Sequence, residues 1–271
     1  MKKILAIFIT LVLILGEFSG CSLSEKKAAI SAYNTALEKA TAKNDELVSI
    51  ISNSEELINA DEPVYDADTL LSFKSAVADA KDALVELPTE MPKNVEDIKG
   101  ITDETLNKVD YTDLIEKLTN AKSDYEYSVK QMKQVNCPDE SFVIERLKKV
   151  EGIMEIAPAT EDNDPNGNLG KQGGYTAQIY FSYEAINQSE ISGSDVIEKG
   201  TDCGGSIEIY RTVDDVEQRD DYLANFDGTA LASGSHTICG TILVRTSDYL
   251  KASQQQELEK AIIDALLAIN E

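Results

Sequence analysis

The sequence lacks several features that would point to a particular chemistry. It has no tryptophan and one histidine, His236, and its four cysteines include no C-x-x-C spacing, which excludes the common zinc sites. No G-x-S-x-G elbow, H-E-x-x-H helix or phosphate-binding loop occurs. No cluster of basic residues occurs either, and the net charge of −24 repels nucleic acid. We therefore expect no nucleic-acid partner and no enzyme of these classes.

The first 21 residues have the layout of an export signal. Two lysines precede an apolar run from Ile4 to Leu15, and Ser19-Gly20 lies directly before Cys21. The run holds about 12 residues, whereas a membrane-spanning helix needs about 20. This pattern indicates a secretory signal that is removed at the small residues, rather than a retained membrane helix.

The same residues resemble the lipobox of bacterial lipoproteins, with Phe18 where that motif usually has leucine. The resemblance implies that residues 1–20 are a signal peptide and that the thiol of Cys21 carries a diacylglyceryl group. Two or three acyl chains, such as palmitate, would hold the protein stably on the extracellular face of the cell membrane. Residues 21–25 would then form the lipid-anchored tether.

Residues 26–135 follow a heptad pattern, with apolar or small residues at alternating spacings of three and four. The pattern breaks at Pro63, Pro88 and Pro92, because proline cannot continue a helix. We expect an antiparallel, coiled-coil-like bundle of three helices that serves as a stalk, with a connector at 93–109. The seam positions are Ile30, Tyr33, Leu37, Ala40, Asn44, Leu47, Ile51, Ser54 and Ile58, then Leu70, Phe73, Val77, Ala80, Leu84 and Leu87, and finally Leu114, Leu118, Ala121, Tyr125, Ser128, Met132 and Val135.

Part of this stalk resembles the FIVAR-type helical modules of Gram-positive surface proteins. The resemblance lies between Leu47 and Glu86, in Leu47, Ile50-Ile51, Leu57, Tyr65, Leu70, Phe73, Ala76 and Asp79-Ala80. It implies either a spacer or a binding unit. We favour the spacer, because the seam residues are used in helix packing.

Residues 139–271 predict an α+β head domain. Helical patterns cover 140–150, 212–226 and 253–269, and period-two patterns typical of strands cover 153–157, 175–183, 206–211 and 236–245. The order α-β-β-β-α-β-α suggests a two-layer α/β sandwich of about four strands, with the helices on one face.

Alternation along the strands assigns side chains to two faces. The inward set, toward the helices, is Tyr175, Ala177, Ile179, Phe181, Ile207, Ile209, Ile238, Ile242 and Val244. The outward set is Gln178, Tyr180, Glu208, Tyr210, Thr237, Thr241 and Arg245. The outward face is polar and holds two tyrosines, which suit a binding surface. We predict binding by Gln178, Tyr180, Glu208, Tyr210 and Arg245, and the alternative is an ordinary half-solvated sheet.

The loop before the second strand begins like a calcium-binding loop. Asp162, Asp164 and Asn166 alternate along the chain and Gly167 follows them, which is the start of the D-x-[DN]-x-[DN]-G pattern. The twelfth loop position is Gly173 instead of the expected bidentate glutamate. Calcium is therefore one interpretation, and the other is a turn whose side chains bond to their own backbone.

Three cysteines remain once Cys21 is assigned to the lipid. An exported location permits a disulfide, and we predict Cys203–Cys239, because both flank strands; the alternative is that Cys137, Cys203 and Cys239 are all reduced. Cys203 with His236 as its base would make a thiol enzyme, although no third orienting group is evident.

The head also resembles a secreted domain of uncharacterised Gram-positive lipoproteins. The resemblance lies in Glu161–Gly167, Gly173–Gln178, Gly204–Glu208 and Arg219–Phe226, and it implies location and fold rather than an activity. We therefore expect a non-enzymatic surface lipoprotein whose stalk presents the head to an envelope, host or phage-related partner, either a protein or a cell-wall ligand. The alternatives are a cell-envelope enzyme using a thiol or carboxylates, and a structural component of a surface complex.

Overall fold

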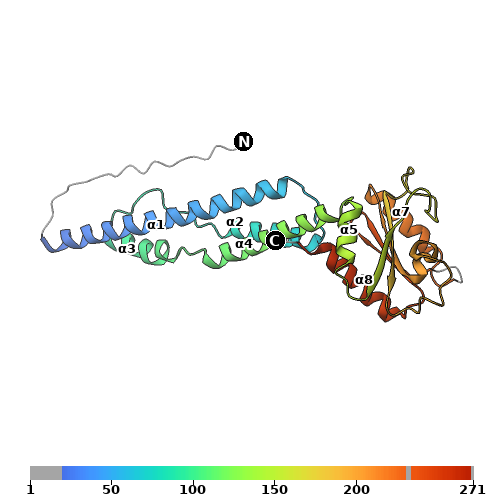
Figure 1. The fold of residues 1–271 in the computed structure, drawn as a ribbon. Coiled ribbons are helices and arrows are strands. Elements are labelled where there is room, and N and C mark those ends of the chain that lie inside the picture. The colour runs from blue at the N-terminus through green and yellow to red at the C-terminus, as the bar shows by residue number, and fades with distance from the viewer. Residues whose placement is uncertain (1–19, 230–232, 270–271) are drawn as a thin grey trace. The chain divides into compact units, whose positions relative to one another are not determined.

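The computed structural model describes residues 20–229 and 233–269, so the predicted signal peptide lies outside the described residues except for Gly20. The described chain combines helices with one antiparallel sheet (Figure 1), which confirms the α and α+β fold class. It divides into two compact units. The first holds residues up to Leu57 together with Ser75–Thr119, and the second holds Ile58–Lys74 and Asn120–Glu271.

Three long helices occur where the heptad pattern predicts them, except that the second ends at Asp82, before the predicted seam residues Leu84 and Leu87. The connector contains further short helices. The elements are α1 (Gly20–Asn59), α2 (Ala67–Asp82), α3 (Val95–Glu104), η1 (Leu106–Lys108) and α4 (Thr112–Val135). Cys21 lies in the first turn of α1. No helix among the described residues is long and apolar enough to cross a membrane.

The core of the first unit is built mainly from the predicted seam. Buried positions include Tyr33, Ala40, Leu47, Ile51, Val77, Ala80 and Leu118, joined by Ile98 from α3. Ion pairs at the surface link neighbouring helices of this unit, such as Lys81 with Glu55 and Lys117 with Asp79. Because several core residues are alanines, the helices can approach closely while each pair buries little apolar area.

The second unit contains the sheet, whose strand order is β1-β2-β3-β5-β4 with every neighbouring pair antiparallel. Its elements are α5 (Glu140–Leu147), β1 (Ile153–Pro158), β2 (Ala177–Tyr183), α6 (Val196–Lys199), η2 (Gly200–Cys203), β3 (Gly204–Ile209), α7 (Val213–Ala224), β4 (Ser235–Cys239), β5 (Ile242–Thr246) and α8 (Ala252–Leu267). The predicted element order therefore holds with two differences: the last predicted strand is two strands, and the short helices α6 and η2, which were not predicted, lie between β2 and β3.

A tight turn divides the predicted strand 236–245 into β4 and β5. Gly240 has φ +64°, a conformation that glycine adopts without steric cost, and Cys239 pairs with Ile242 across the turn. The two turn residues change the alternation of side chains. Ile238 therefore lies on the face predicted for Thr237, and Thr237 lies on the opposite face, where its hydroxyl donates to Glu259 on α8 at 3.3 Å.

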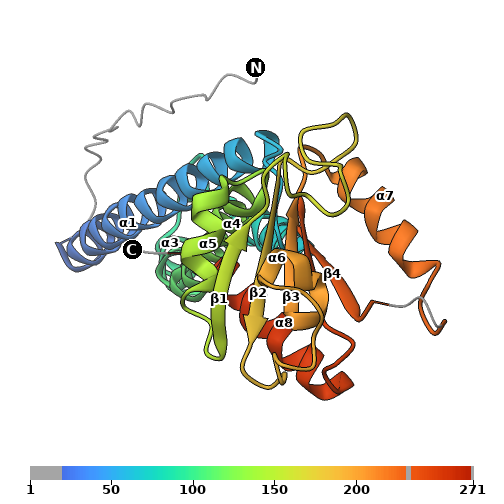
Figure 2. The same cartoon turned by 45° about the vertical axis from the view of Figure 1, so that its right-hand side comes forward.

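Helices cover both faces of the sheet, so the expectation of helices on one face only is wrong (Figure 2). One face packs against α5, α6 and α8 through Ile179, Phe181, Ile207, Val244 and Ile262. The other face lies under α7, where Tyr175, Tyr210, Val216, Leu223 and Leu243 form a second cluster. Tyr175, which we predicted inward with the first set, belongs to this second cluster.

The division of the chain differs from the predicted boundary between 135 and 139. Val135, at the end of α4, belongs to the main core of the second unit. Its carbonyl oxygen accepts a hydrogen bond from the Thr241 backbone N–H at 3.0 Å, and Gln134 donates to the Leu266 carbonyl at 2.5 Å. The C-terminal part of α4 is thus part of the same folded body as the sheet.

Candidate functional site

The residues predicted to form an outer binding face do lie together, but they are buried. Relative exposure is 0% for Gln178 and Glu208, 2% for Tyr180 and Tyr210, and 7% for Arg245. The prediction of an open polar surface is therefore wrong, and so is the half-solvated alternative. Helix α7 and the loop before β2 supply the cover that alternation in the strands alone could not reveal.

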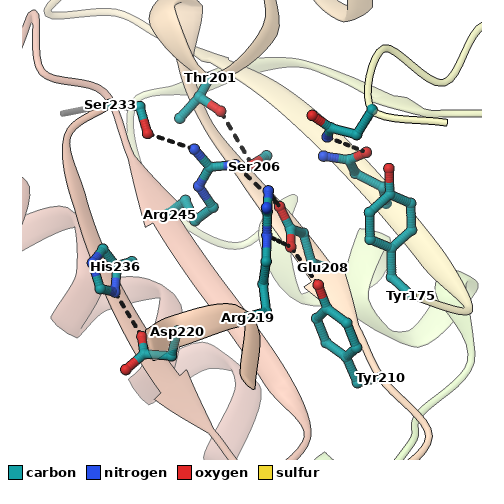
Figure 3. Close-up of polar contacts among 12 residues, drawn as sticks. Tyr175, Thr201, Ser206, Glu208, Tyr210, Arg219, Asp220, Ser233, His236 and Arg245 are labelled. Atoms are coloured by element: carbon teal, nitrogen blue, oxygen red, sulfur yellow. Dashed lines mark hydrogen bonds and ion pairs between the residues drawn. The ribbon is translucent and has the colours of Figure 1, made fainter. Parts of the chain in front are cut away.

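Glu208 is the centre of a buried charge cluster (Figure 3). Arg219 donates to it twice, from Nε to Oε2 at 2.9 Å and from Nη2 to Oε1 at 3.1 Å. Arg245 donates from Nη1 to Oε1 at 3.0 Å, and the Tyr210 hydroxyl donates to Oε2 at 2.7 Å. Four hydrogen bonds thus satisfy one carboxylate that has no contact with water.

Sheet register and helix periodicity explain why these residues meet. Glu208 pairs with Leu243 in the register of β3 and β5, and Arg245 lies two residues further on the same face. On α7, Arg219 lies between the buried Val216 and Leu223 at spacings of three and four, so it shares their inward face. Arg219 is a candidate functional residue that was not predicted, although its spacing from Val216 and Leu223 indicates the inward face of the helix.

Two arginines outweigh the desolvation of Glu208. Burial alone would raise the pKa of this carboxyl, but the hydrogen bonds and charge of Arg219, followed by the charge of Arg245, hold it below its usual value. Burial, reinforced by the charge of Glu208, raises the pKa of Tyr210. The cluster therefore holds an ionised glutamate, two guanidinium groups and a neutral phenol, which leaves one excess positive charge inside the head.

A pocket of about 410 Å³ opens beside this cluster. Its walls are the loop before β2, through Asn166 and Asn168, and α7, through Asp215, Gln218, Arg219 and Tyr222. Asn166 also donates to Gln178 at 3.3 Å, and the Nε2 of Gln178 is buried with no hydrogen-bond partner among the described residues. This pocket is the part of the site that a ligand can reach.

The acidic loop matches the turn interpretation. Asp164 Oδ2 accepts from the backbone amides of Asn168 and Leu169 at 2.7 and 2.9 Å, and Oδ1 accepts from the amide of Asn166 at 3.0 Å and from the Tyr175 hydroxyl at 2.5 Å. Partial burial alone would raise the pKa of Asp164, but these hydrogen bonds lower it. Asp162 is exposed, and no group of three or more His, Cys, Asp or Glu among the described residues could hold a metal. Calcium binding at Asp162, Asp164 and Asn166 stays a prediction.

The cysteines are not paired as predicted. Cys203 and Cys239 are both buried and free, and Cys137 is exposed and free. Cys203 lies just before β3, at the end of the sheet where Gly205 pairs with Thr246, whereas Cys239 pairs with Ile242 at the opposite end of β5. The length of a strand therefore separates the two residues, more than a disulfide can span.

The proposed thiol–imidazole pair does not form either. The Cys203 thiol faces backbone oxygens of Phe181 and Gly200, at 3.4 and 3.1 Å, and burial raises its pKa to about 11. His236 lies under α7, where its Nδ1 is 2.6 Å from the Asp220 carboxylate (Figure 3). Cys203 packs in the core on the other side of the sheet, so the imidazole cannot act as its base.

Comparison of the chain with protein-family models, curated proteins and solved structures finds no match.

Proposed function

We propose that this chain is a non-enzymatic, lipid-anchored protein of the extracellular face of the cell membrane, whose helical segment acts as a spacer for an α+β binding head. Support for the anchor comes from the export pattern that ends at Cys21. The resemblance of the head to secreted lipoprotein domains agrees with that location. The partner is an envelope, host or phage-related component.

One observation carries the binding part of this proposal. The pocket of about 410 Å³ lies on folded elements of the head and is lined by side chains that can donate and accept hydrogen bonds. Pockets of about 300–1,000 Å³ are typical of small-ligand sites. The thiol-enzyme alternative gains no support, because Cys203 is buried and separated from His236.

Acylation and location can be tested together in cells of a Gram-positive host. The expected product begins at Cys21, carries a diacylglyceryl group by intact-mass measurement, and sediments with membranes. A Cys21→Ala variant should lose the lipid mass, whereas the matched Cys137→Ala variant should keep both lipid and membrane location. An unmodified Cys21 in a wild-type chain that still contains residues 1–20 would reject the anchor.

A further inference from the structure

The pocket beside the charge cluster is formed by one face of α7. Asp215, Gln218, Arg219 and Tyr222 all line it, and their spacings of three and four place them in one row along the helix. The loop before β2 forms the opposite wall through Asn166 and Asn168. A short stretch of helix thus presents a carboxylate, an amide, a guanidinium and an aromatic ring to the same space.

Tyr222 offers a flat apolar surface that is held in place. Its side chain is 53% exposed. The Arg219 guanidinium lies 5.5 Å from the ring centroid, and Phe226 packs edge-on with its centroid 5.1 Å away and an interplanar angle of 67°. Because neighbours fix the ring before any ligand arrives, stacking on it costs little side-chain entropy.

The charges at the pocket favour a neutral ligand. The charge cluster carries one excess positive charge, from Arg219 and Arg245 against Glu208, and Asp215 at the pocket wall offsets it. A cation would meet Arg219, which already lies against the Tyr222 ring. An anion would meet Asp215 and a chain with a net charge of −24, which opposes its approach.

The polar groups of the wall suit hydroxyl groups. Side-chain amides such as those of Asn168 and Gln218 donate and accept, as a hydroxyl does. Asp215 accepts through Oδ1, since its Oδ2 accepts from Thr212 at 2.7 Å. Arg219 uses Nε and Nη2 on Glu208, and its Nη1 has no hydrogen-bond partner among the described residues.

The loop wall is preorganised. The Asp164 carboxylate accepts from three backbone amides of this loop, those of Asn166, Asn168 and Leu169. Gly174 packs so closely under the Asn168 carbonyl oxygen that a Cβ at this position would collide with it. The side-chain amides of Asn166 and Asn168 therefore extend from a backbone that needs no rearrangement for binding.

We propose that this pocket binds a neutral saccharide, whose ring stacks on Tyr222 while its hydroxyl groups bond to Asp215, Gln218, Asn166, Asn168 and Nη1 of Arg219. A sugar ring has an apolar C–H face and a rim of hydroxyl groups, and this pocket pairs an aromatic surface with groups that donate and accept. The inference rests on the proposed binding role of the head and names the class of its ligand. The saccharide can belong to an envelope polymer or to a host glycan.

The test uses the full chain on an array of neutral oligosaccharides of bacterial and animal type, with their phosphorylated and sialylated analogues as the charged set. We expect binding to neutral members that changes less than about twofold between about 0.05 and 0.5 M NaCl, since screening acts on charged ligands. Tyr222→Ala should weaken this binding by about tenfold or more, and Asp215→Asn should weaken it by several-fold. Binding to the bacterial oligosaccharides would indicate an envelope polymer, and binding to the animal oligosaccharides would indicate a host glycan.

Matched controls keep the result interpretable. Tyr249→Ala removes a tyrosine that is 57% exposed and lies outside the pocket, and Asp214→Asn changes the neighbouring exposed carboxylate. Both should bind like the wild type, with unchanged thermal unfolding in all four variants. Absence of binding to every neutral glycan, preference for the charged set, or equal loss in Tyr222→Ala and Tyr249→Ala would each overturn the saccharide proposal. Capture of an envelope protein by the head, without glycan binding, would preserve the proposed function and reject this inference.

Discussion

Glu208 shows how a single buried residue organises the head. Its carboxylate is wholly buried and accepts from two arginines and one tyrosine. Replacing Glu208 with Gln would leave two guanidinium groups near one another without a counter-charge. We expect Glu208→Gln to lower the free energy of unfolding by about 3–5 kcal/mol.

Urea denaturation with the fluorescence of the tyrosines measures this change. Glu217→Gln serves as the control, because Glu217 is an exposed residue of α7, the helix that carries Arg219, and surface changes of this kind fall within about 0.5 kcal/mol. Equal stability of the two variants would mean that the arginines find other partners or that the cluster contributes no net stability.

The same carboxylate predicts a loss of stability in acid. The pKa of Glu208 in the folded protein lies below its ordinary value of 4.5, so the unfolded chain binds the additional proton. The stabilisation that the ionised Glu208 carboxylate provides is complete above pH 4.5 and is lost progressively as the pH falls below that value. Urea midpoints measured from neutral pH down to about pH 3 should therefore fall more steeply for the wild type than for Glu208→Gln, and parallel curves would contradict the assignment.

At the scale of the elements, the sequence predicts most of the helices and strands and less of how they cover one another. The long helices follow from the heptad seam, and β2, β3 and α8 follow from periods of two and 3.6. The β4–β5 turn was missed because the residues on both sides of Gly240 continue an apolar alternation, although a glycine inside such a run is itself a turn signal. The α7 cover was missed because a strand pattern gives two faces without saying what lies on each.

The candidate site was only partly predictable, because alternation along the strands groups its residues on one face but does not show what covers that face. Alternation placed Gln178, Glu208 and Arg245 on one face, and the sheet register confirms that grouping. Their burial depends on Arg219 of α7 and on the loop held by Asp164. Both are contacts between residues distant in sequence, and no local pattern contains them.

Asn44, a polar residue in the helical seam, takes part in hydrogen bonds that join α1 to the chain after α2 and to Tyr111. Tyr111, just before α4, donates from its hydroxyl to Asn44 Oδ1 at 2.7 Å and accepts from the Val85 backbone N–H at 2.9 Å, while Asn44 Nδ2 donates to the Val85 carbonyl at 2.8 Å. These bonds hold the chain after α2 against α1, which explains an asparagine at a seam position. Tyr111→Phe leaves the partly buried backbone N–H of Val85 without its hydrogen bond and should cost about 1 kcal/mol.

The matched variant for this junction is Tyr127→Phe. Tyr127 lies on α4 and is 47% exposed, whereas Tyr111 is 4% exposed, so the same chemical change removes no buried hydrogen bond there. Thermal unfolding followed by helical circular dichroism should show a loss for Tyr111→Phe alone. Equal melting of both variants would show that water replaces the hydroxyl at the junction.

At the scale of the whole molecule, the acidic charge sets the response to salt. The chain carries 49 acidic and 25 basic residues, and its ion pairs outside the head lie at the surface, such as Lys99 with Glu25 and Lys117 with Asp79. Exposed pairs of this kind contribute about 0–1 kcal/mol each and weaken in salt. The repulsion among the excess carboxylates acts over longer distances, and salt weakens it as well.

These two effects have opposite signs, and the excess of acidic residues decides between them. Raising NaCl from about 0.01 to about 0.5 M shortens the screening length from about 30 Å to about 4 Å. We therefore expect the Tm to rise by about 2–4 °C, which corresponds to about 1 kcal/mol for a chain of this size. Choline chloride at the same ionic strength should give the same rise, because the effect is screening and not binding of a particular ion. A Tm that falls with either salt would show that the surface ion pairs outweigh the repulsion among the excess carboxylates.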